Sequence, residues 1–483
     1  MDDAAATAAA LRDLTATQAL AALAEGRATS VALVTAALER AEALADLHPV
    51  ITLDRDGALA AAADSDAARA AGEPLGALAG LPVLVKDNID VAGLPTTGGT
   101  PALEHHRPAA DAEVVARLRA AGAVVLAKTN LHELAFGITT TNATPFAGVA
   151  ENPWDRTRIP GGSSGGTAIG VAARVAPLGL STDTGGSGRI PPAFTGVVGL
   201  RPSVGDGGER RWPLDGVLPI SAMLDTVCPT GRTVRDVALL DAVVTGAGVP
   251  EPVSLAGQRL GVVAQLWEGL AAEVEDTART ALDRLAGAGA VLVDVDLPDL
   301  LVLAGAVVFP VALHDPLTDV PAYLAASGAE VTLEEVVTGV ASPDVRGLMG
   351  VVTGDEHAGH ADAVDVRRPA LQRLIAGTLA DLDLAALVFP TSPVPPAVID
   401  RENGSGTTSV DGGEPVDTFA TTVRNCMPAS SAGTPGLSLP AGLAPSGLPV
   451  GLSLEGALGS DTDLLALGLA VEDVLGTLPA PPV

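Results

Sequence analysis

The order of apolar and polar residues along the chain predicts helices that alternate with short apolar strands. Apolar side chains recur at helical spacing after Ser30, which predicts a helix over residues 31–45 with Ser30 as its N-cap. Thr15 with Gln18 forms a capping-box pattern, which predicts an earlier helix that stops at Gly26. Further helices are predicted up to residue 71 and over 111–121, 166–173, 268–286 and 462–475, and strands over 50–53, 82–85, 124–127, 175–180, 291–295 and 447–454.

This alternation favours an α/β fold with a largely parallel or mixed sheet. The 483-residue chain shows no internal repeat and no clear linker, so we expect a single large domain over residues 1–483. The segment at about 310–380 has the weakest pattern and is mostly helical, and we interpret it as a variable lobe over the functional site. The Gly, Ser and Thr residues at 404–413 predict a mobile surface loop.

The overall composition limits the classes of partner. The formal net charge is −30, whereas nucleic acids and anionic membranes bind basic surfaces, so we expect neither nucleic acid nor membrane as a partner. Aromatic residues make up only 2% of the chain, too few for a base-stacking platform. Hydrophobic residues make up 47%, which is typical of a globular protein.

Cysteine and lysine are both rare. Cys228 and Cys426 lie far apart without a CxxC pattern, which favours a reducing compartment. The first residues lack the basic region of a signal peptide, and no apolar run reaches about 18 residues, the length of a membrane span. We therefore expect a cytoplasmic protein. Lysine occurs only at positions 86 and 128, and we interpret Lys128 as a structural residue that closes a strand.

Two serines are flanked by glycines, Ser163 in the run PGGSSGG at 160–166 and Ser187 in DTGGSGR at 183–189. Glycine leaves a substrate room to approach and lets consecutive main-chain amides point into one small volume, where they can hold an anion. Either run alone is equally well explained as a tight loop. The two serines are 24 residues apart, and Lys86 follows a predicted apolar strand upstream, so the combination indicates a catalytic site.

These motifs resemble those of the amidase signature family, and the resemblance extends from about residue 14 to about residue 475. Three further segments resemble the mandelamide and indole-acetamide hydrolase branch: TTGGTPAL at 96–103, KTNLHELAFGI at 128–138 and AGTPGLSLP at 432–440. The resemblance implies a mixed central sheet covered by helices on both faces, with a signature core at about 80–235. It implies a hydrolase of carbon–nitrogen bonds other than peptide bonds, with no cofactor and no metal.

The resemblance also implies roles for individual residues. It implies a Ser–Ser–Lys triad, with Ser187 as nucleophile, Ser163 as bridging serine and Lys86 as base, and a cis peptide bond before Ser163. It implies that Asp183 and Arg189 brace the nucleophile loop. The remaining implied residues are Thr184, Gly185, Gly186 and Ser187, whose main-chain amides would form the oxyanion hole, and Gly137, Ile138, Thr139 and Thr140, which would contact the substrate.

The chemistry of amide cleavage is consistent with a lysine base. An amide is a poor electrophile, and a serine must lose its proton to a base before it can attack. Histidine is the commonest base, but no histidine lies between Glu133 and Leu313, the span that holds both serines, and none follows His360. Lysine can serve if burial lowers its pKa toward neutrality, and Lys86 follows an apolar strand as this requires.

Two residues depart from the usual pattern of the family. Gly188 stands where a branched apolar residue is usual after the nucleophile, and Cys228 replaces the commoner glycine before Pro229. From the missing side chain at position 188 we expect extra room for substrate beside Ser187, or a looser loop. Substitution of Gly188 by Val or Ile should then narrow the range of acyl groups that the enzyme accepts.

Other chemistries match only parts of the sequence. GGSSG at 161–165 fits the G-x-S-x-G elbow of α/β-hydrolases, but Pro153 and Pro160 precede the serine where that elbow needs a strand. The glycines suggest a phosphate cradle, but no Gly-Lys-Ser/Thr follows them. His357 and His360 hint at a metal site, yet no third ligand is patterned, which favours a solvated helix face.

Two functions remain open. The first is a stand-alone amidohydrolase, a monomer or homodimer, that releases ammonia or an amine from a small-molecule amide. The branch resemblance implies an aryl or arylalkyl amide, with esters, anilides and carbamates (urethanes) as further options. The second is the catalytic subunit of a tRNA-dependent amidotransferase, which acts inside a complex. The acidic composition and the branch-specific segments favour the first function.

Overall fold

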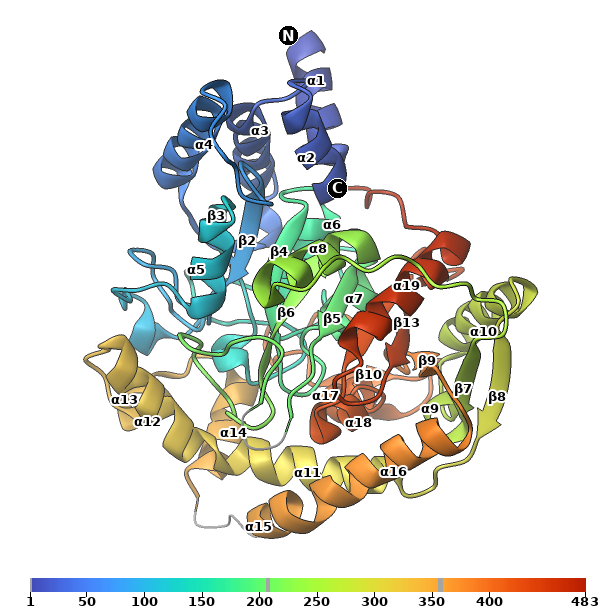
Figure 1. The fold of residues 1–483 in the computed structure, drawn as a ribbon. Coiled ribbons are helices and arrows are strands. Elements are labelled where there is room, and N and C mark those ends of the chain that lie inside the picture. Colours follow the sequence, from blue (N-terminus) through green and yellow to red (C-terminus); the bar gives the residue numbers. More distant parts are fainter. Residues whose placement is uncertain (1, 206–208, 355–358) are drawn as a thin grey trace.

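An eleven-stranded sheet runs through the molecule with helices packed around it (Figure 1). The computed structural model describes residues 2–205, 209–354 and 359–483. The strands of this sheet are β1 Val50–Leu53, β2 Pro82–Lys86, β3 Val124–Thr129, β4 Leu178–Asp183, β5 Val198–Arg201, β6 Thr226–Gly231, β7 Arg259–Val263, β8 Val291–Val295, β9 Ala386–Pro390, β12 Gly436–Leu443 and β13 Pro449–Glu455. A separate hairpin pairs β10 Thr407–Ser409 with β11 Pro415–Asp417.

The sheet is mixed, with its strands in the order β1-β3-β2-β4-β6-β5-β12-β13-β9-β7-β8. Strands β3, β2 and β4 run parallel to one another, and so do β9, β7 and β8. The pairs between β4 and β9 are antiparallel, as is the edge pair β1–β3. A single domain with a mixed sheet between helices is the fold class that the sequence predicts.

The described helices are α1 Asp2–Asp13, α2 Ala16–Ala24, α3 Ser30–Ala43, α4 Arg55–Ala70, α5 Glu113–Ala120, α6 Gly165–Ala172, α7 Ile190–Thr195, α8 Val234–Thr245, α9 Ala264–Trp267, α10 Ala272–Gly287, α11 Leu300–His314, α12 Pro316–Ser327, α13 Leu333–Gly339, α14 Pro343–Val352, α15 His360–Asp362, α16 Arg368–Asp381, α17 Thr418–Val423, α18 Met427–Ala432 and α19 Asp461–Leu475. Several of the shortest are single turns. In Figure 1 the yellow and orange helices α11–α16 form a band along the lower side of the molecule.

Strand β2 shows why this sheet needs helices on both faces. Its side chains are all buried, as a strand in the middle of a covered sheet requires. Val83 and Val85 pack into a core with residues of α2, α5 and α8, whereas Leu84 packs into another core with residues of α3, α4 and α6. Because successive side chains point to opposite faces, one apolar run joins the two cores.

Four local predictions from the sequence were wrong in detail. Thr29, and not Ser30, caps α3 by accepting the main-chain N–H of Ala32, while Ser30 donates its hydroxyl to Gly80 at 2.7 Å. Helix α10 begins only at Ala272, and the strand predicted over 175–180 is β4, which begins at Leu178. Pro177 has no N–H for a sheet, which explains the later start of β4. The predicted loop at 404–413 contains strand β10 of the hairpin.

The parallel pairing of β2 and β4 brings the two motif regions together. Lys86 is the last residue of β2, and Asp183 is the last residue of β4. Parallel neighbours end at the same edge of a sheet, where α/β proteins commonly bind their ligands. The chain after β4 therefore leaves toward Lys86, and Ser187 follows in that loop.

Lys128 is part of the interior. It lies in β3, is fully buried, and its Nζ donates to the carbonyl of Pro95 at 2.7 Å. The same atom lies 2.9 Å from Asp87 Oδ1, the carboxylate next to Lys86 in sequence. A buried lysine needs such partners, so the geometry fits the structural interpretation of Lys128.

One observation concerns membranes. Within residues 2–205, 209–354 and 359–483, no single helix is both long and apolar enough to cross a bilayer. Helices α11 and α12, which are joined at a bend, are long and apolar enough to cross a bilayer only when they are taken together, and only by length and composition.

Candidate active site

Lys86 reaches the bridging-serine position predicted from the sequence. Its Nζ lies 2.7 Å from Ser163 Oγ and 2.7 Å from Thr182 Oγ1, and the lysine is fully buried. Burial lowers the pKa of Lys86 to about 7, against the partial opposition of nearby acidic groups. A neutral amine at this pKa can take a proton from Ser163 near physiological pH, which an ordinary lysine cannot do.

The loop around Ser163 is tightly packed. The peptide bond between Gly162 and Ser163 is cis, as the resemblance implies. A side chain on Gly162 would meet the main chain of Ile138 at 2.6 Å, so glycine is required for this close approach. Ser164 joins this loop to the end of β4, since its hydroxyl donates to the carbonyl of Thr182 at 3.2 Å. The two glycine-rich loops are thus held to one another.

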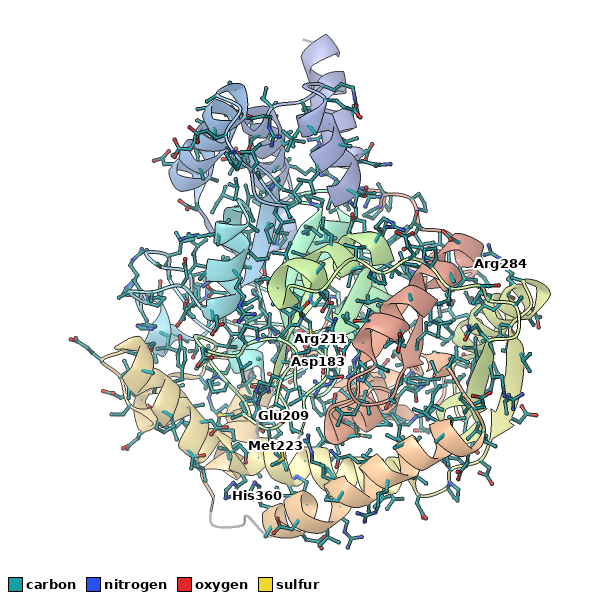
Figure 2. All side chains as sticks on the ribbon, in the orientation of Figure 1. Asp183, Glu209, Arg211, Met223, Arg284 and His360 are labelled. Carbon is teal, nitrogen blue, oxygen red and sulfur yellow. The ribbon has the colours of Figure 1, made fainter. Side chains whose placement is uncertain are left out.

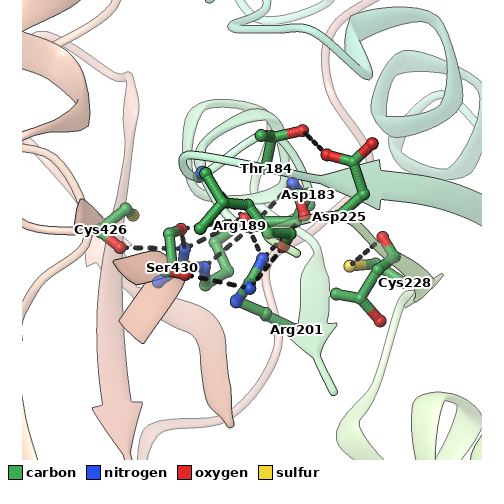
Figure 3. A network of polar contacts seen from close by, with 12 residues as sticks. Asp183, Thr184, Arg189, Arg201, Asp225, Cys228, Cys426 and Ser430 are labelled. Atoms are coloured by element: carbon green, nitrogen blue, oxygen red, sulfur yellow. Dashed lines mark hydrogen bonds and ion pairs between the residues drawn. The ribbon is translucent and has the colours of Figure 1, made fainter. Parts of the chain in front are cut away.

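Asp183 braces the loop that carries Ser187 (Figure 3). Its carboxylate lies 2.9 Å from Arg189 Nε and 2.9 Å from Arg201 Nη1. The main-chain N–H groups of Gly186 and Gly188 donate to the same carboxylate at 2.9 and 3.1 Å. Burial alone would raise the pKa of Asp183, but the two guanidinium groups lower it well below its ordinary value. The loop is therefore wrapped around a buried, ionised carboxylate.

These contacts narrow the set of amides available for an oxyanion. Of the four predicted donors, Gly186 already gives its N–H to Asp183. Thr184, Gly185 and Ser187 line the cavity described below, which places them on the side where a substrate carbonyl would lie. We therefore assign Gly186 to the bracing of the loop and keep the other three amides as candidate donors.

A cavity of about 160 Å³ opens beside Ser187. It is lined by Thr184, Gly185 and Ser187, by Ala135–Ile138 and Ile220, by Val308, Phe309, Ala312, Leu313 and Leu348 from the helical band, and by Phe419, Val423 and Met427 from α17 and α18. None of these lining side chains is charged, and the only hydroxyls among them belong to Thr184 and Ser187. Such a cavity fits a neutral, apolar group placed next to Ser187.

The substrate segment predicted from the sequence divides into two halves. Gly137 and Ile138 line the cavity, whereas Thr139 and Thr140 do not. Thr139 donates its hydroxyl to Gly404 at 3.1 Å, and Thr140 donates to Gly161 at 2.8 Å. The two threonines support the loops around the cavity, so a contact between them and substrate is not favoured by the geometry.

The expectation of extra room beside Gly188 was wrong. A Cβ added to Gly188 would lie 2.6 Å from Cys228 Sγ and 3.2 Å from Asp183 Cβ, and Gly188 does not line the cavity. Cys228 on β6 therefore fills the volume that is missing at position 188. The two departures from the family pattern compensate for one another, and neither enlarges the space for substrate.

Several residues of the site escaped prediction from the sequence. Asp225 accepts the hydroxyl of Thr184 at 2.5 Å and the main-chain N–H of Ile220 at 2.7 Å, so it connects the loop after β4 to the cavity wall. Burial raises the pKa of Asp225 to about 6. Thr182 and Arg201 were also missed. Polar residues that are buried beside a reactive group carry no local signal, because their pattern resembles that of a surface segment.

On the helical band, His314, Asp315 and His360 offer ligand atoms within 4.8 Å of one another, but the two histidine rings are stacked. His360 (labelled in Figure 2) lies 2.9 Å from Asp315, and its ring stacks on that of His314 with centroids 3.8 Å apart and planes at 23°. Imidazole ligands bind metals best in the plane of the ring, so two nearly parallel stacked rings are poorly oriented for one shared ion. His357, the partner suggested by the sequence, lies outside the described residues.

Comparison with known proteins identifies the family. The amidase family profile matches residues 32–465, most of the chain and both serine loops. The chain belongs to the amidase signature family. It is 40% identical to a mandelamide hydrolase of Pseudomonas putida, over 98% of this chain and 93% of the relative. It is 37% identical to an indoleacetamide hydrolase of Rhizobium radiobacter, over 92% of this chain and 93% of the relative.

Other relatives of this amidase have a different role or a known structure. One subunit of the glutamyl-tRNA(Gln) amidotransferase of Salinispora tropica is 35% identical over 95% of this chain and 96% of the relative. A crystal structure described as an amidase superposes with a TM-score of 0.84 at 34% identity, covering 96% of this chain and all of that one. The amidase is therefore a hydrolase of amide bonds with the fold of its family.

Proposed function

We propose that this amidase cleaves small carboxamides through an acyl-enzyme formed on Ser187, with Ser163 and Lys86 as a proton relay. The observation that carries the proposal is the 2.7 Å contact between the buried Lys86 Nζ and Ser163 Oγ, next to the loop of Ser187. A lysine pKa of about 7 supports the role of Lys86 as base. Arginine or ordinary lysine would stay protonated there.

In the proposed first step, the Ser187 hydroxyl gives its proton to Ser163, which passes its own proton to Lys86. The Ser187 oxygen then forms a bond to the carbonyl carbon, and the main-chain amides of Thr184, Gly185 and Ser187 stabilise the anionic oxygen. The carbon–nitrogen bond breaks as the proton returns through Ser163 to the leaving amine. Water then attacks the ester that links the acyl group to Ser187, with the same proton relay through Ser163 and Lys86. The carboxylic acid is released and Ser187 regains its proton.

We propose an aryl or arylalkyl amide as the substrate class. The chain has only six phenylalanines, and three of them, Phe136, Phe309 and Phe419, line this one cavity. Phe309 on α11 and Phe419 on α17 face each other at a centroid distance of 6.3 Å. Aromatic side chains that are scarce elsewhere and gathered here suit a flat apolar ring. The named substrates of the two hydrolase relatives agree with this choice.

The proposed reaction also covers substrates other than simple amides. Esters, anilides and urethanes carry an acyl carbon of the same kind, so they remain within the proposed reaction. We propose that residues 80–235 form the signature core and that the lobe at 310–380 supplies cavity wall.

The amidotransferase alternative rests on a relative of lower identity than the two hydrolases, so we favour a monomer or homodimer that acts alone in the cytoplasm.

The test combines a substrate panel with covalent labelling. Purified wild type and Ser187→Ala should be compared on phenylacetamide, indole-acetamide, short aliphatic amides and an aryl urethane. We expect the aryl amides to be hydrolysed best and the variant to lose about 10⁴-fold in kcat. A fluorophosphonate should label the wild type at Ser187, as read by peptide mass spectrometry. Labelling of another serine, or normal turnover by the variant, would overturn the triad.

A further inference from the structure

A histidine with no assigned role lies inside the loop that forms the cavity wall. His132 follows β3 and is fully buried, and Gly137, Thr139 and Thr140 lie against its imidazole ring. A Cβ added to Gly137 would collide with this ring, so the absence of a side chain at position 137 lets the loop close on it. The segment LHEL that contains His132 is part of the branch-specific motif at 128–138.

The contacts of His132 determine its tautomer. Its Nδ1 accepts the main-chain N–H of Thr140 at 3.2 Å, and because that donor is a backbone amide, Nδ1 carries no proton. The other nitrogen, Nε2, lies 3.0 Å from Asp344 Oδ2 at the start of α14. Burial alone would raise the pKa of Asp344, but the contact with His132 lowers it below its ordinary value, so the carboxylate is ionised. With Nδ1 as an acceptor, the imidazole proton belongs on Nε2, the nitrogen that lies 3.0 Å from the Asp344 carboxylate.

From Thr140 the contacts continue to the bridging serine. The Thr140 hydroxyl donates to the carbonyl of Gly161 at 2.8 Å and accepts the N–H of Gly165 at 3.2 Å, which lie on either side of Ser163. The main-chain N–H of His132 donates to the carbonyl of Ser163 itself at 2.9 Å. His132 thus contacts the serine loop by two routes, one direct and one through Thr140.

The loop that His132 supports adopts an unfavourable backbone. Leu134, Ala135 and Thr140 have φ angles of 55°, 61° and 55°, a region that residues with side chains rarely adopt. Such conformations persist only where the surroundings enforce them. The bond from Thr140 N–H to the imidazole is one of the contacts that hold this loop, and Ala135 from the same loop lines the cavity.

We propose that His132 is a positioning residue for amide hydrolysis, and that its unprotonated Nδ1, oriented by Asp344, holds the cavity loop and the Ser163 loop in register. The proposal rests on the function proposed above, because its readout is the chemistry at Ser187. His132 touches no reacting atom in this scheme. It acts through Thr140, and Asp344 links it to helix α14 of the helical band.

Two nearly isosteric substitutions of His132 distinguish the role of Nδ1 from the role of Nε2. Asparagine places its side-chain oxygen close to the position of Nδ1 but cannot reach Asp344, whereas glutamine reaches Asp344 but has no acceptor at the Nδ1 position. We expect His132→Asn to keep kcat within about fivefold of wild type, and His132→Gln to lose about 10- to 100-fold because the Thr140 amide is left unpaired. Equal losses in the two variants, or a smaller loss in His132→Gln, would overturn the proposal.

Asp344 provides a second, independent pair. Asp344→Asn retains an oxygen that can accept Nε2–H, so its kcat should stay near that of wild type. Asp344→Ala removes this acceptor, so the His132 imidazole is no longer held in the tautomer that carries its proton on Nε2. The value of kcat should then fall by about tenfold with a smaller change in KM. A variant Asp344→Ala with normal kcat would count against a role for the tautomer.

The controls distinguish positioning from folding and from a wrong catalytic scheme. His105→Asn changes an exposed histidine and should leave both kcat and melting temperature unchanged. Melting temperatures of the His132 variants should be measured beside the rate of fluorophosphonate labelling. Equal melting temperatures with slower labelling in His132→Gln support the proposal, whereas a loss explained entirely by unfolding contradicts it. Labelling of wild type at Ser187 tests the proposed function separately.

Discussion

Buried polar groups crowd the edge of the sheet where β2 and β4 end, whereas the cavity beside it is walled by apolar side chains. On the polar side, Lys86 contacts Ser163 and Asp183 binds two arginines, and each group depends on several others. On the apolar side, residues such as Phe309 and Phe419 come from separate helices, and their side chains carry no hydrogen-bonding group. We call the edge with Lys86, Ser163 and Asp183 the polar corner. A substitution in the polar corner should therefore impair the hydrolysis of every substrate. A substitution in the cavity wall should alter only the preference for substrates that contact the changed side chain.

The largest effect is expected at Lys86. Lys86→Ala should lower kcat by about 10³- to 10⁴-fold, and Lys86→Arg should not restore it because arginine stays protonated. The base must be neutral to act, so wild-type activity should rise as the pH increases through about 7, the pKa of the buried amine. Initial rates between pH 5 and 10 measure this. A flat profile that extends below about pH 5 would contradict a lysine base.

The second effect concerns stability. Asp183→Asn leaves two buried guanidinium groups without their carboxylate, so the free energy of unfolding should fall by about 3–5 kcal/mol. Asp46→Asn is the matched control, because the Asp46 carboxylate pairs with Arg156 but is 64% exposed. That change should cost less than about 1 kcal/mol. Denaturant titrations of both variants give the comparison, and equal losses would remove the distinction between buried and exposed pairs.

A third effect tests whether Gly188 and Cys228 share one volume. Gly188→Val should clash with Cys228 and lower kcat about tenfold or more for small and bulky amides alike. Adding Cys228→Gly to the same chain opens the space again and should recover most of the activity. A double-mutant cycle on kcat measures the coupling. Losses that simply add would show that the two positions are independent.

The smallest effect is expected on the cavity wall. Phe309→Ala and Phe419→Ala should each raise KM for aryl amides by about 5- to 10-fold and leave kcat nearly unchanged, since each removes apolar contact with the ring. Short aliphatic amides should be affected less. Val302→Ala on the same helix as Phe309 is the control, because Val302 is 69% exposed and does not line the cavity. A fall in kcat instead of a rise in KM would place the two rings within the polar corner.

The difference between the two regions also explains what could be predicted from the sequence. Lys86, Ser163 and Asp183 come from glycine-rich motifs and strand ends, and the local pattern around each one indicates both position and chemistry. The mixed sheet was predicted for a similar reason, because helices alternating with apolar strands such as β2 leave a clear periodic pattern. The cis peptide before Ser163 was found where the family resemblance implied it.

The cavity wall could not be predicted in the same way. Val308, Leu348 and Met427 are ordinary apolar residues of helices, and only the tertiary fold brings them to Ser187. The same holds for the contact between Gly188 and Cys228, which lie 40 residues apart on different elements. A missing side chain in a sequence indicates empty space only if nothing else fills it, and the packing of β6 decides that.

The burial of both lysines has a practical consequence for chemical modification. Lys86 and Lys128 are the only lysines in the sequence, and both have 0% of their surface exposed. Reagents that react with amines, such as succinimidyl esters and aldehyde crosslinkers, therefore find no lysine on the folded surface. Attachment to a support or a dye would have to use another functional group, such as the abundant carboxylates. Acylation of either lysine would then report on the opening of the fold.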